Sequence, residues 1–241
     1  MGSILKAAVA DGLMTFVWVF FASTAGACTS VVATYFGVQA DLYANLLITA
    51  FIIVLHIFIF DIVADILGGA SFSLAGTLSF YAAGVGDDDL LSMAFRLPAQ
   101  TAGAVGGVLA ILEYMPKKYN HMLDGPSMKV DAHTGALMEG FLTFMISLAV
   151  LWIILRGPKN YIVKTVLISI STVTVIVLGS SYTGPSMNPA NAFAWAYIKN
   201  NHNTWEQFYV YWICPLIGSI LAGWVFRVLF PLKEVTKEKK I

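Results

Sequence analysis

The sequence predicts an all-helical integral membrane protein with six membrane-spanning helices and two shorter half-helices that enter the membrane without crossing it. Three observations lead to this fold class. Of the 241 residues, 58% are hydrophobic and only 12% are charged, whereas soluble domains carry about 25% charged residues. The apolar residues gather into six long segments, and the two halves of the chain repeat one another. Because the net charge is zero and the sequence holds no basic block, we expect no nucleic-acid partner.

Six apolar segments are long enough to cross a bilayer, which takes about 20 residues. They are residues 4–27, 42–66, 95–114, 134–155, 161–179 and 208–230. In lipid each segment must be a helix, since every backbone polar group has to be satisfied internally. The first segment has no basic region or cleavage site before it, so we expect it to be a retained span and not a signal peptide.

The distribution of basic residues predicts the orientation. Six spans place both termini on one side. The basic residues expected on that side are Lys6, Arg96, Arg156, Lys159, Lys164, Arg227, Lys233, Lys237, Lys239 and Lys240. Those expected on the other side are Lys117, Lys118, Lys129 and Lys199. Since cytosolic loops carry the excess of Lys and Arg, the termini are predicted to be cytosolic.

An internal repeat divides a single domain, 1–241, into two halves. The matching pairs are residues 11–16 with 139–144, 69–75 with 184–190, and Pro98 with Pro215. The first repeat then covers about residues 1–125, the second about 130–230, and a basic cytosolic tail follows at 231–241. Each repeat has three spans, so the repeats must be inverted, which predicts a site at the midplane where their short segments meet.

The two short segments carry helix start signals. Asn188 is a strong N-cap, Pro189 suits the first helical position, and Ala190 continues the helix. Each half-helix would present about half a positive charge to the membrane centre. Two such ends disfavour a cation while their free N–H groups can hold a neutral polar molecule. We therefore expect a channel for small neutral solutes.

The Asn188-Pro189-Ala190 motif within an inverted six-span repeat resembles the aquaporin (major intrinsic protein) family. Further runs resemble the plant small basic intrinsic proteins of the first type. These runs are residues 96–100, 130–136, 154–158, 182–185, 202–205 and 209–213. The resemblance covers nearly the whole chain and implies an aquaporin-like fold, a homotetramer, water as the solute and the endoplasmic reticulum membrane.

The first half-helix departs from the family pattern, which usually has Asn-Pro-Ala at both starts. Here the first motif is Ser73-Leu74-Ala75. Ser73 still caps a helix well, but a hydroxyl offers one donor where an amide offers two. Leu74 is expected either to narrow the lumen or to pack behind it.

The second departure is Asn191, which stands where most family members have the filter Arg. The resemblance implies a selectivity filter made by Asn191, Pro185, Ile176 and Ile53, with Thr49 as the competing residue from the second span. This filter has no cation, so it should repel cations less and discriminate poorly by hydrogen bonding.

Two of the carboxylates inside spans lie at repeat-related positions, and an ionisable residue within a span suggests a function. Asp11 and Glu139 match the buried acids with which the family holds the loops before the half-helices, and a proton relay is the alternative. Asp11 is one methylene shorter than the usual Glu, which puts its reach in question. In the second span, His56 is expected to be a hydrogen-bonded core or interface histidine rather than a pore-lining or pH-sensing one. Asp61 and Asp65 are expected to reach interfacial water rather than to sense cations or pH.

In the tail, Lys237 and Lys239 resemble a dilysine signal for retrieval to the endoplasmic reticulum, which acts on a cytosolic terminus.

The predicted function is passive conduction of water across a lipid bilayer. The alternatives are a channel for another small neutral solute such as glycerol, urea, hydrogen peroxide or ammonia, an inverted-repeat secondary transporter, and a closed structural membrane protein. We expect no enzyme activity and no cofactor, because the sequence has no nucleophile–base pattern and no phosphate loop. We expect no metal site, because the His and Cys residues have no ligand spacing.

Overall fold

The chain is all-helical over residues 2–86 and 88–231, which are the residues that the computed structural model describes. Six stretches of this described chain are long and apolar enough to cross a membrane. They are Gly2–Tyr35, Leu42–Ile66, Leu90–Tyr114, Ala132–Leu155, Tyr161–Gly179 and Trp205–Leu229. Two shorter helices, α4 (Leu74–Ala83) and α8 (Pro189–Ile198), lie between them. The predicted fold class is therefore confirmed.

The first span is two helices, not one. α1 (Gly2–Ala22) and α2 (Ala25–Tyr35) meet at a break. There the hydroxyls of Ser23 and Thr24 each donate to a helix carbonyl 2.7 Å away, a local bond that competes with regular helix. Because the apolar residues continue through this break, the sequence predicted one uninterrupted segment, residues 4–27. The observed span ends eight residues later, at Tyr35.

The second and third spans are α3 (Leu42–Ile66) and α5 (Leu90–Tyr114). α3 has the predicted bounds. α5 begins five residues before the predicted start at Phe95 because Asp89 caps it, accepting the N–H of Ser92 at 2.7 Å. Arg96 therefore lies within the helix rather than at its first turn, a correction that matters for the site.

The second half begins after a short 3₁₀ turn, η1 (Lys117–Met122). α6 (Ala132–Leu155) and α7 (Tyr161–Gly179) follow, close to their predicted bounds. The last span combines α9 (Trp205–Phe208), a π-helical turn η2 (Tyr209–Ile213) and α10 (Cys214–Leu229). The π turn lies just before Pro215, whose missing N–H cannot make the regular helix bond.

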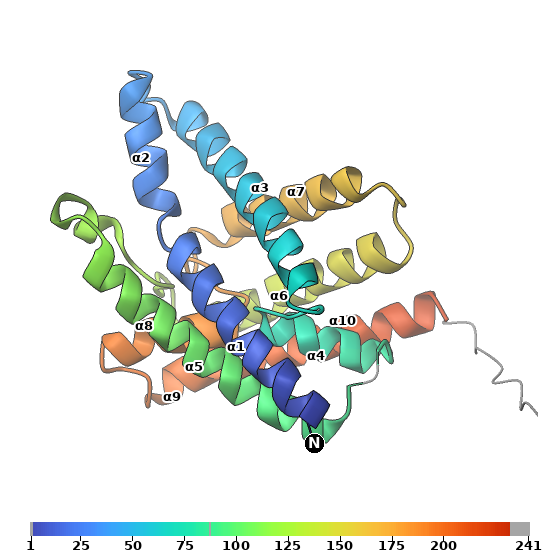
Figure 1. Ribbon diagram of the computed structural model, residues 1–241. Coiled ribbons are helices and arrows are strands. Elements are labelled where there is room, and N and C mark those ends of the chain that lie inside the picture. Colours follow the sequence, from blue (N-terminus) through green and yellow to red (C-terminus); the bar gives the residue numbers. More distant parts are fainter. Residues whose placement is uncertain (1, 87, 232–241) are drawn as a thin grey trace, which may run out of the picture.

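Glycines set the closest helix contacts, and these are alike in the two halves. α1 packs along α5, as Figure 1 shows, and α6 packs on α10. A Cβ atom at Gly103 would lie 2.1 Å from the Gly12 carbonyl oxygen, and one at Gly218 would lie 2.2 Å from the Gly140 carbonyl oxygen. No larger residue fits at such an approach, so both crossings depend on glycine.

These contacts correct one detail of the predicted repeat. A Cβ at Gly12 would lie 3.1 Å from the carbonyl oxygen of Ala99, and a Cβ at Gly140 the same distance from that of Cys214. Ala99 therefore corresponds to Cys214, and the residue that corresponds to Pro215 is Gln100. The expected match of Pro98 with Pro215 is wrong by two residues, because two prolines near a helix start do not fix its register.

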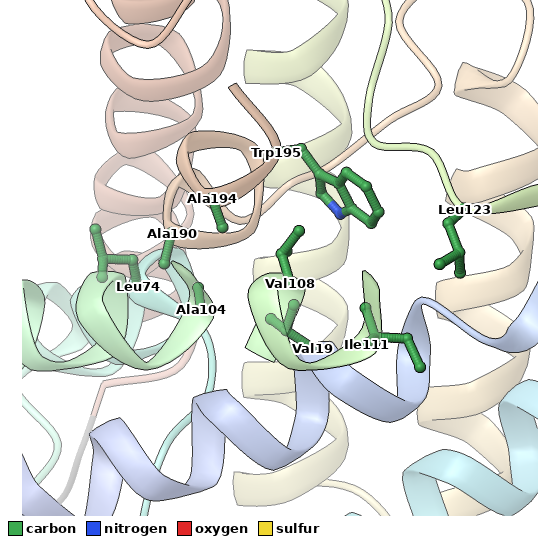
Figure 2. Packing of buried hydrophobic residues seen from close by; sticks show 9 residues of the cluster. All are labelled: Val19, Leu74, Ala104, Val108, Ile111, Leu123, Ala190, Ala194 and Trp195. Carbon is green, nitrogen blue, oxygen red and sulfur yellow. The ribbon is translucent and has the colours of Figure 1, made fainter. Parts of the chain in front are cut away.

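The half-helices meet inside the buried core. One cluster joins side chains of α1, α4, α5 and α8 with Leu123, which follows η1 (Figure 2). Its members are Val19, Leu74, Ala104, Val108, Ile111, Leu123, Ala190, Ala194 and Trp195. Burial of such apolar side chains against one another through van der Waals packing holds helices together in lipid. The core therefore fixes the positions of both half-helices relative to the spans.

Candidate functional site

The second half-helix begins as predicted, at Asn188. Its side-chain Oδ1 accepts the N–H of Ala190 at 3.3 Å, and Pro189 occupies the first turn of α8. The Nδ2 atom of the same amide donates to the backbone carbonyl of Phe72, 2.8 Å away. Phe72 immediately precedes the cap of the first half-helix. This bond spans 116 positions in sequence and joins the two half-helix starts through one side chain.

The first half-helix also begins where the sequence predicts. Ser73 caps α4 by accepting the N–H of Gly76 at 3.1 Å. Leu74, the residue in place of proline, is 0% exposed and packs near Ala190 and Ala104 in the shared core (Figure 2). This burial favours packing behind the lumen over narrowing it, and the role of Leu74 stays a prediction.

Glu139 holds the loop of the second half-helix. It is fully buried on α6, and its carboxylate accepts the Thr183 hydroxyl at 2.8 Å and two backbone N–H groups, those of Ser186 and Met187, at 3.0 Å each. Tyr211 adds a bond from its hydroxyl to the carbonyl of Thr183 at 3.1 Å. Among the described residues, every donor to this carboxylate is neutral and belongs to the loop itself.

Asp11 holds the loop of the first half-helix in a different way. It is also fully buried, but from the described part of the chain it accepts a single backbone N–H, that of Ser71, at 2.8 Å. Its other donors come from α5. Arg96 binds it with Nε at 2.7 Å and Nη2 at 3.1 Å, and Gln100 donates at 2.8 Å. The shorter acid therefore reaches its loop, with fewer backbone contacts than Glu139 makes.

Sequence reasoning missed the side chains that bond to these acids, namely Arg96, Gln100 and Thr183. It also missed Thr77 and Tyr211, which bond in turn to Gln100 and to the Thr183 carbonyl. Arg96 was counted only as a cytosolic charge. Once the true start of α5 is known, Arg96 lies within a span, and an ionisable residue within a span is expected to pair with an opposite charge. This rule could have identified Arg96. Asp11 is the buried opposite charge, in the neighbouring span.

The predicted filter residues lie on the elements expected of them. Pro185 packs against the end of α7, where a Cβ at Gly179 would meet its ring at 2.7 Å. The Asn191 amide donates to the hydroxyl of Ser186 in its own loop at 3.5 Å. Ile53 and Ile176 are half-buried on α3 and α7, two helices in contact. Their assignment as a filter stays a prediction.

Thr49, the competing filter residue, is occupied by its neighbours. Its hydroxyl lies 2.9 Å from that of Thr29 on α2 and donates to the Asn45 carbonyl at 2.8 Å. These bonds link α3 to α2 and occupy the Thr49 hydroxyl, which favours Ile53 over Thr49 as the filter residue from the second span.

His56 joins two helices. Its Nδ1 lies 2.8 Å from the carbonyl oxygen of Ile52, and its Nε2 lies 3.2 Å from that of Phe21, next to the break between α1 and α2. This is the interface role expected of it. Asp61 accepts the Thr165 hydroxyl at 3.4 Å, and Asp65 is exposed.

No group of three or more His, Cys, Asp or Glu residues that could hold a metal occurs in the described part of the chain. Cys28 and Cys214 are both free thiols. The expected signal residues Lys237 and Lys239 lie outside the described residues.

The chain is similar to known channel proteins over almost its whole length. The family model described as major intrinsic protein matches residues 2–226. Aquaporin SIP1-2 of Zea mays is 59% identical over 230 residues, covering 95% of this chain and 94% of the relative. Aquaporin SIP1-1 of Zea mays is 58% identical over 100% of this chain and 99% of the relative. Aquaporin SIP1-1 of Arabidopsis thaliana is 48% identical, with the same coverage.

A solved structure has the same fold. The aquaglyceroporin of Plasmodium falciparum superposes with a TM-score of 0.73 at 20% identity, covering 95% of this chain and 98% of that one. An inverted pair of capped half-helices held by buried acids, a family match over nearly all of the chain and this shared fold agree with one another. The chain belongs to the major intrinsic protein family of membrane channels, and within it to the small basic intrinsic proteins of the first type.

Proposed function

We propose that the protein conducts water passively through each protomer. The observation that carries this proposal is the bond from Asn188 to the Phe72 carbonyl, which brings the two half-helix starts together. Each start carries about half a positive charge, so the point where they meet disfavours a cation. Neutral water suits the free donors at helix ends. The maize and Arabidopsis relatives are themselves named aquaporins.

A second candidate is a channel for other small neutral solutes. The predicted filter residues Asn191, Pro185, Ile176 and Ile53 carry no charge, so they offer little to exclude urea, glycerol, hydrogen peroxide or ammonia by hydrogen bonding. The similar fold of an aquaglyceroporin is compatible with this alternative. The solute then depends on the width of the filter.

We further propose a homotetramer in the endoplasmic reticulum membrane with both termini in the cytosol. Family resemblance supports the tetramer. The excess of basic residues on the side of the termini supports the orientation.

Lys237 and Lys239 support retrieval of the protein to the endoplasmic reticulum from later compartments. Replacing both with serine in a fluorescently tagged protein should move the protein out of the reticulum. Unchanged reticular fluorescence would argue against the signal.

The test of conduction is stopped-flow osmotic shrinkage of liposomes that contain the purified protein. We expect faster shrinkage than in empty liposomes, with a low activation energy. Equal shrinkage rates would refute the proposal of a water channel. Swelling in isosmotic urea or glycerol decides whether larger neutral solutes also pass.

The Asn191→Arg variant tests the filter with the same vesicles. The added cation would occupy space and offer several fixed donors, so urea and glycerol flux should fall more than water flux. A variant with an unchanged ratio of solute to water permeability would place the filter elsewhere. The matched control is Asn201→Arg, since Asn201 is exposed at the end of the loop after α8.

A further inference from the structure

The buried acid of the first repeat is held by a cation, and that of the second repeat is not. Glu139 accepts bonds only from Thr183, Ser186 and Met187 among the described residues. Asp11 instead lies in a bidentate pair with Arg96, whose side chain is 10% exposed while that of Asp11 is 0% exposed. A bidentate Arg–carboxylate pair fixes both position and orientation. The two repeats therefore use different chemistry at equivalent places.

The glycine contacts define which residues are equivalent. Ala99 corresponds to Cys214, and Arg96 and Tyr211 each lie three residues before these equivalent positions, with the π turn intervening in the second repeat. Both side chains point to the half-helix loop of their own repeat. Tyr211 reaches its loop directly through the Thr183 carbonyl, whereas Arg96 reaches Asp11, which in turn accepts the Ser71 N–H. Arg96 thus acts on the loop through the acid.

The length of the acid explains the need for the cation. Glu139 reaches the N–H groups of two successive loop residues, Ser186 and Met187. Asp11 reaches only the first of the equivalent pair, Ser71. With one methylene fewer, its carboxylate has a single backbone bond to define where it sits. The two bonds from Arg96 supply the missing constraint.

The cation is itself anchored at the end of the bundle. Nη1 of Arg96 donates to Asp88 at 2.5 Å, and the other oxygen of Asp88 accepts the Ser92 hydroxyl at 2.7 Å. Gln100 adds a second link, because its amide donates to both Asp11 and Thr77, a residue of α4. The chain of contacts runs from the turn before α5 to the first half-helix.

We propose that Arg96 is a positioning residue of the channel: it fixes Asp11, and through it the loop and start of the first half-helix, in place of the second backbone contact that a longer acid makes. The inference rests on the proposed function for its effect on flux, since a displaced half-helix start would obstruct or loosen the path of the solute. Its effect on the loop does not depend on flux.

Hydrogen–deuterium exchange of the reconstituted protein tests the effect on the loop. In Arg96→Leu, we expect amides of residues 69–76 to exchange about tenfold faster, the factor that corresponds to one charge-assisted hydrogen bond. Residues 184–190 should change much less, because Glu139 has its own donors and the Asn188 amide alone carries the recorded bond to the first loop. Arg156→Leu is the matched control, since the Arg156 guanidinium binds the Pro231 carbonyl at 3.0 Å and not a half-helix loop.

Rescue by a longer acid separates positioning from a general loss of stability. In the double variant Asp11→Glu/Arg96→Leu, the longer carboxylate can reach the N–H groups of Ser71 and Phe72 without help, as Glu139 does in its repeat. We expect exchange of residues 69–76 to return to within about twofold of the wild type, because a second backbone bond, from the Phe72 N–H, would supply the constraint that the two Arg96 bonds supplied. Absence of rescue would overturn the proposal.

Two milder variants keep the test decisive if Arg96→Leu does not fold. Arg96→Lys keeps the positive charge but loses the bidentate contact with Asp11. Asp88→Asn weakens only the contact between Arg96 and residue 88. Both should raise exchange in residues 69–76 alone, by less than about tenfold. No rise in either variant, or an equal rise in both loops, would refute the proposal.

Osmotic permeability of the same vesicles links the loop to transport. We expect water flux to fall in Arg96→Leu and to recover in the double variant. Wild-type vesicles no faster than empty ones would refute the proposed function, while the exchange data would still decide the role of Arg96. Normal flux in Arg96→Leu together with faster exchange of its loop would refute the link to transport.

Discussion

The Glu139→Gln substitution tests the buried acid of the second repeat with almost no change in side-chain volume. The carboxylate is 0% exposed and accepts three hydrogen bonds. Two of them, from Thr183 and Ser186, end on Oε1, and the third, from the Met187 N–H, ends on Oε2. An amide keeps one oxygen but replaces the other with a donor. The Met187 N–H would then face an N–H group.

The expected loss of stability follows from these three contacts. The two bonds that still find an oxygen weaken from the charged to the neutral value, by about 1 kcal/mol each. A buried N–H without an acceptor costs about 1–3 kcal/mol. Together the losses come to about 4 kcal/mol. For a chain of this length such a loss lowers the melting temperature by about 10 °C.

Thermal unfolding of the purified protein in detergent, followed by tryptophan fluorescence, measures this loss. The control is Glu113→Gln, because Glu113 is exposed near the end of α5, and we expect no shift there. A melting temperature of Glu139→Gln within about 3 °C of the wild type, corresponding to less than about 1 kcal/mol, would refute the reasoning. It would mean that the loop is held by its packing and not by the carboxylate.

Gly218→Ala should destabilise the crossing of α6 and α10 by at least about 3 kcal/mol, since its Cβ would lie 2.2 Å from a carbonyl oxygen of α6 and overpacking is costly. The control is Gly26→Ala, because the nearest atom to a Cβ there is 3.8 Å away. Equal melting temperatures of the two variants would contradict the close contact at Gly218. Asn188→Ala removes the cap of α8 and the bond to the Phe72 carbonyl that joins the half-helix loops. Hydrogen–deuterium exchange should therefore rise in both loops at once, and the protein should lose about 2 kcal/mol of stability. A rise in the second loop alone would show that the bond between the loops does not stabilise the first. The hydroxyl and backbone N–H of Thr134 hold the pKa of Asp131, the cap of α6, below its usual value. The stability that Asp131 adds to the folded protein is therefore complete above about pH 4 and is lost as the pH falls through the lower pKa of the folded state. The melting-temperature difference between the wild type and Asp131→Asn should therefore shrink on acidification below about pH 4, and a constant difference would exclude this role.

Local chemistry made much of this structure predictable. The caps Ser73 and Asn188 act within three residues of their own position, so the starts of both half-helices follow from a few letters of sequence. The apolar runs of α3 and α7 each begin after a polar cap, Asp41 or Asn160, and both helices have the predicted bounds. Such signals need no knowledge of what lies across the bundle.

Contacts between distant residues could not be predicted in the same way. The pair of Asp11 and Arg96 spans 85 positions, and it requires both the register of α1 on α5 and the true start of α5. That start depends on Asp89, one of three successive acids, each able to cap a helix. Reading the apolar run alone placed the helix start at Phe95 and left Arg96 at the surface. The break after Ala22 was hidden for a related reason, since Ser23 and Thr24 bond within an otherwise uninterrupted apolar segment.

The different chemistry of the two repeats has a consequence for how they respond to perturbation. The bonds around Glu139 come from a loop hydroxyl and two backbone N–H groups, none of which carries a charge. The bonds around Asp11 continue through Arg96 to Asp88, whose side chain is 29% exposed. An exposed charge is screened by salt, whereas a buried dipole contact is screened little. High ionic strength on the face that holds the start of α5 should therefore loosen the first half-helix loop and leave the second unchanged.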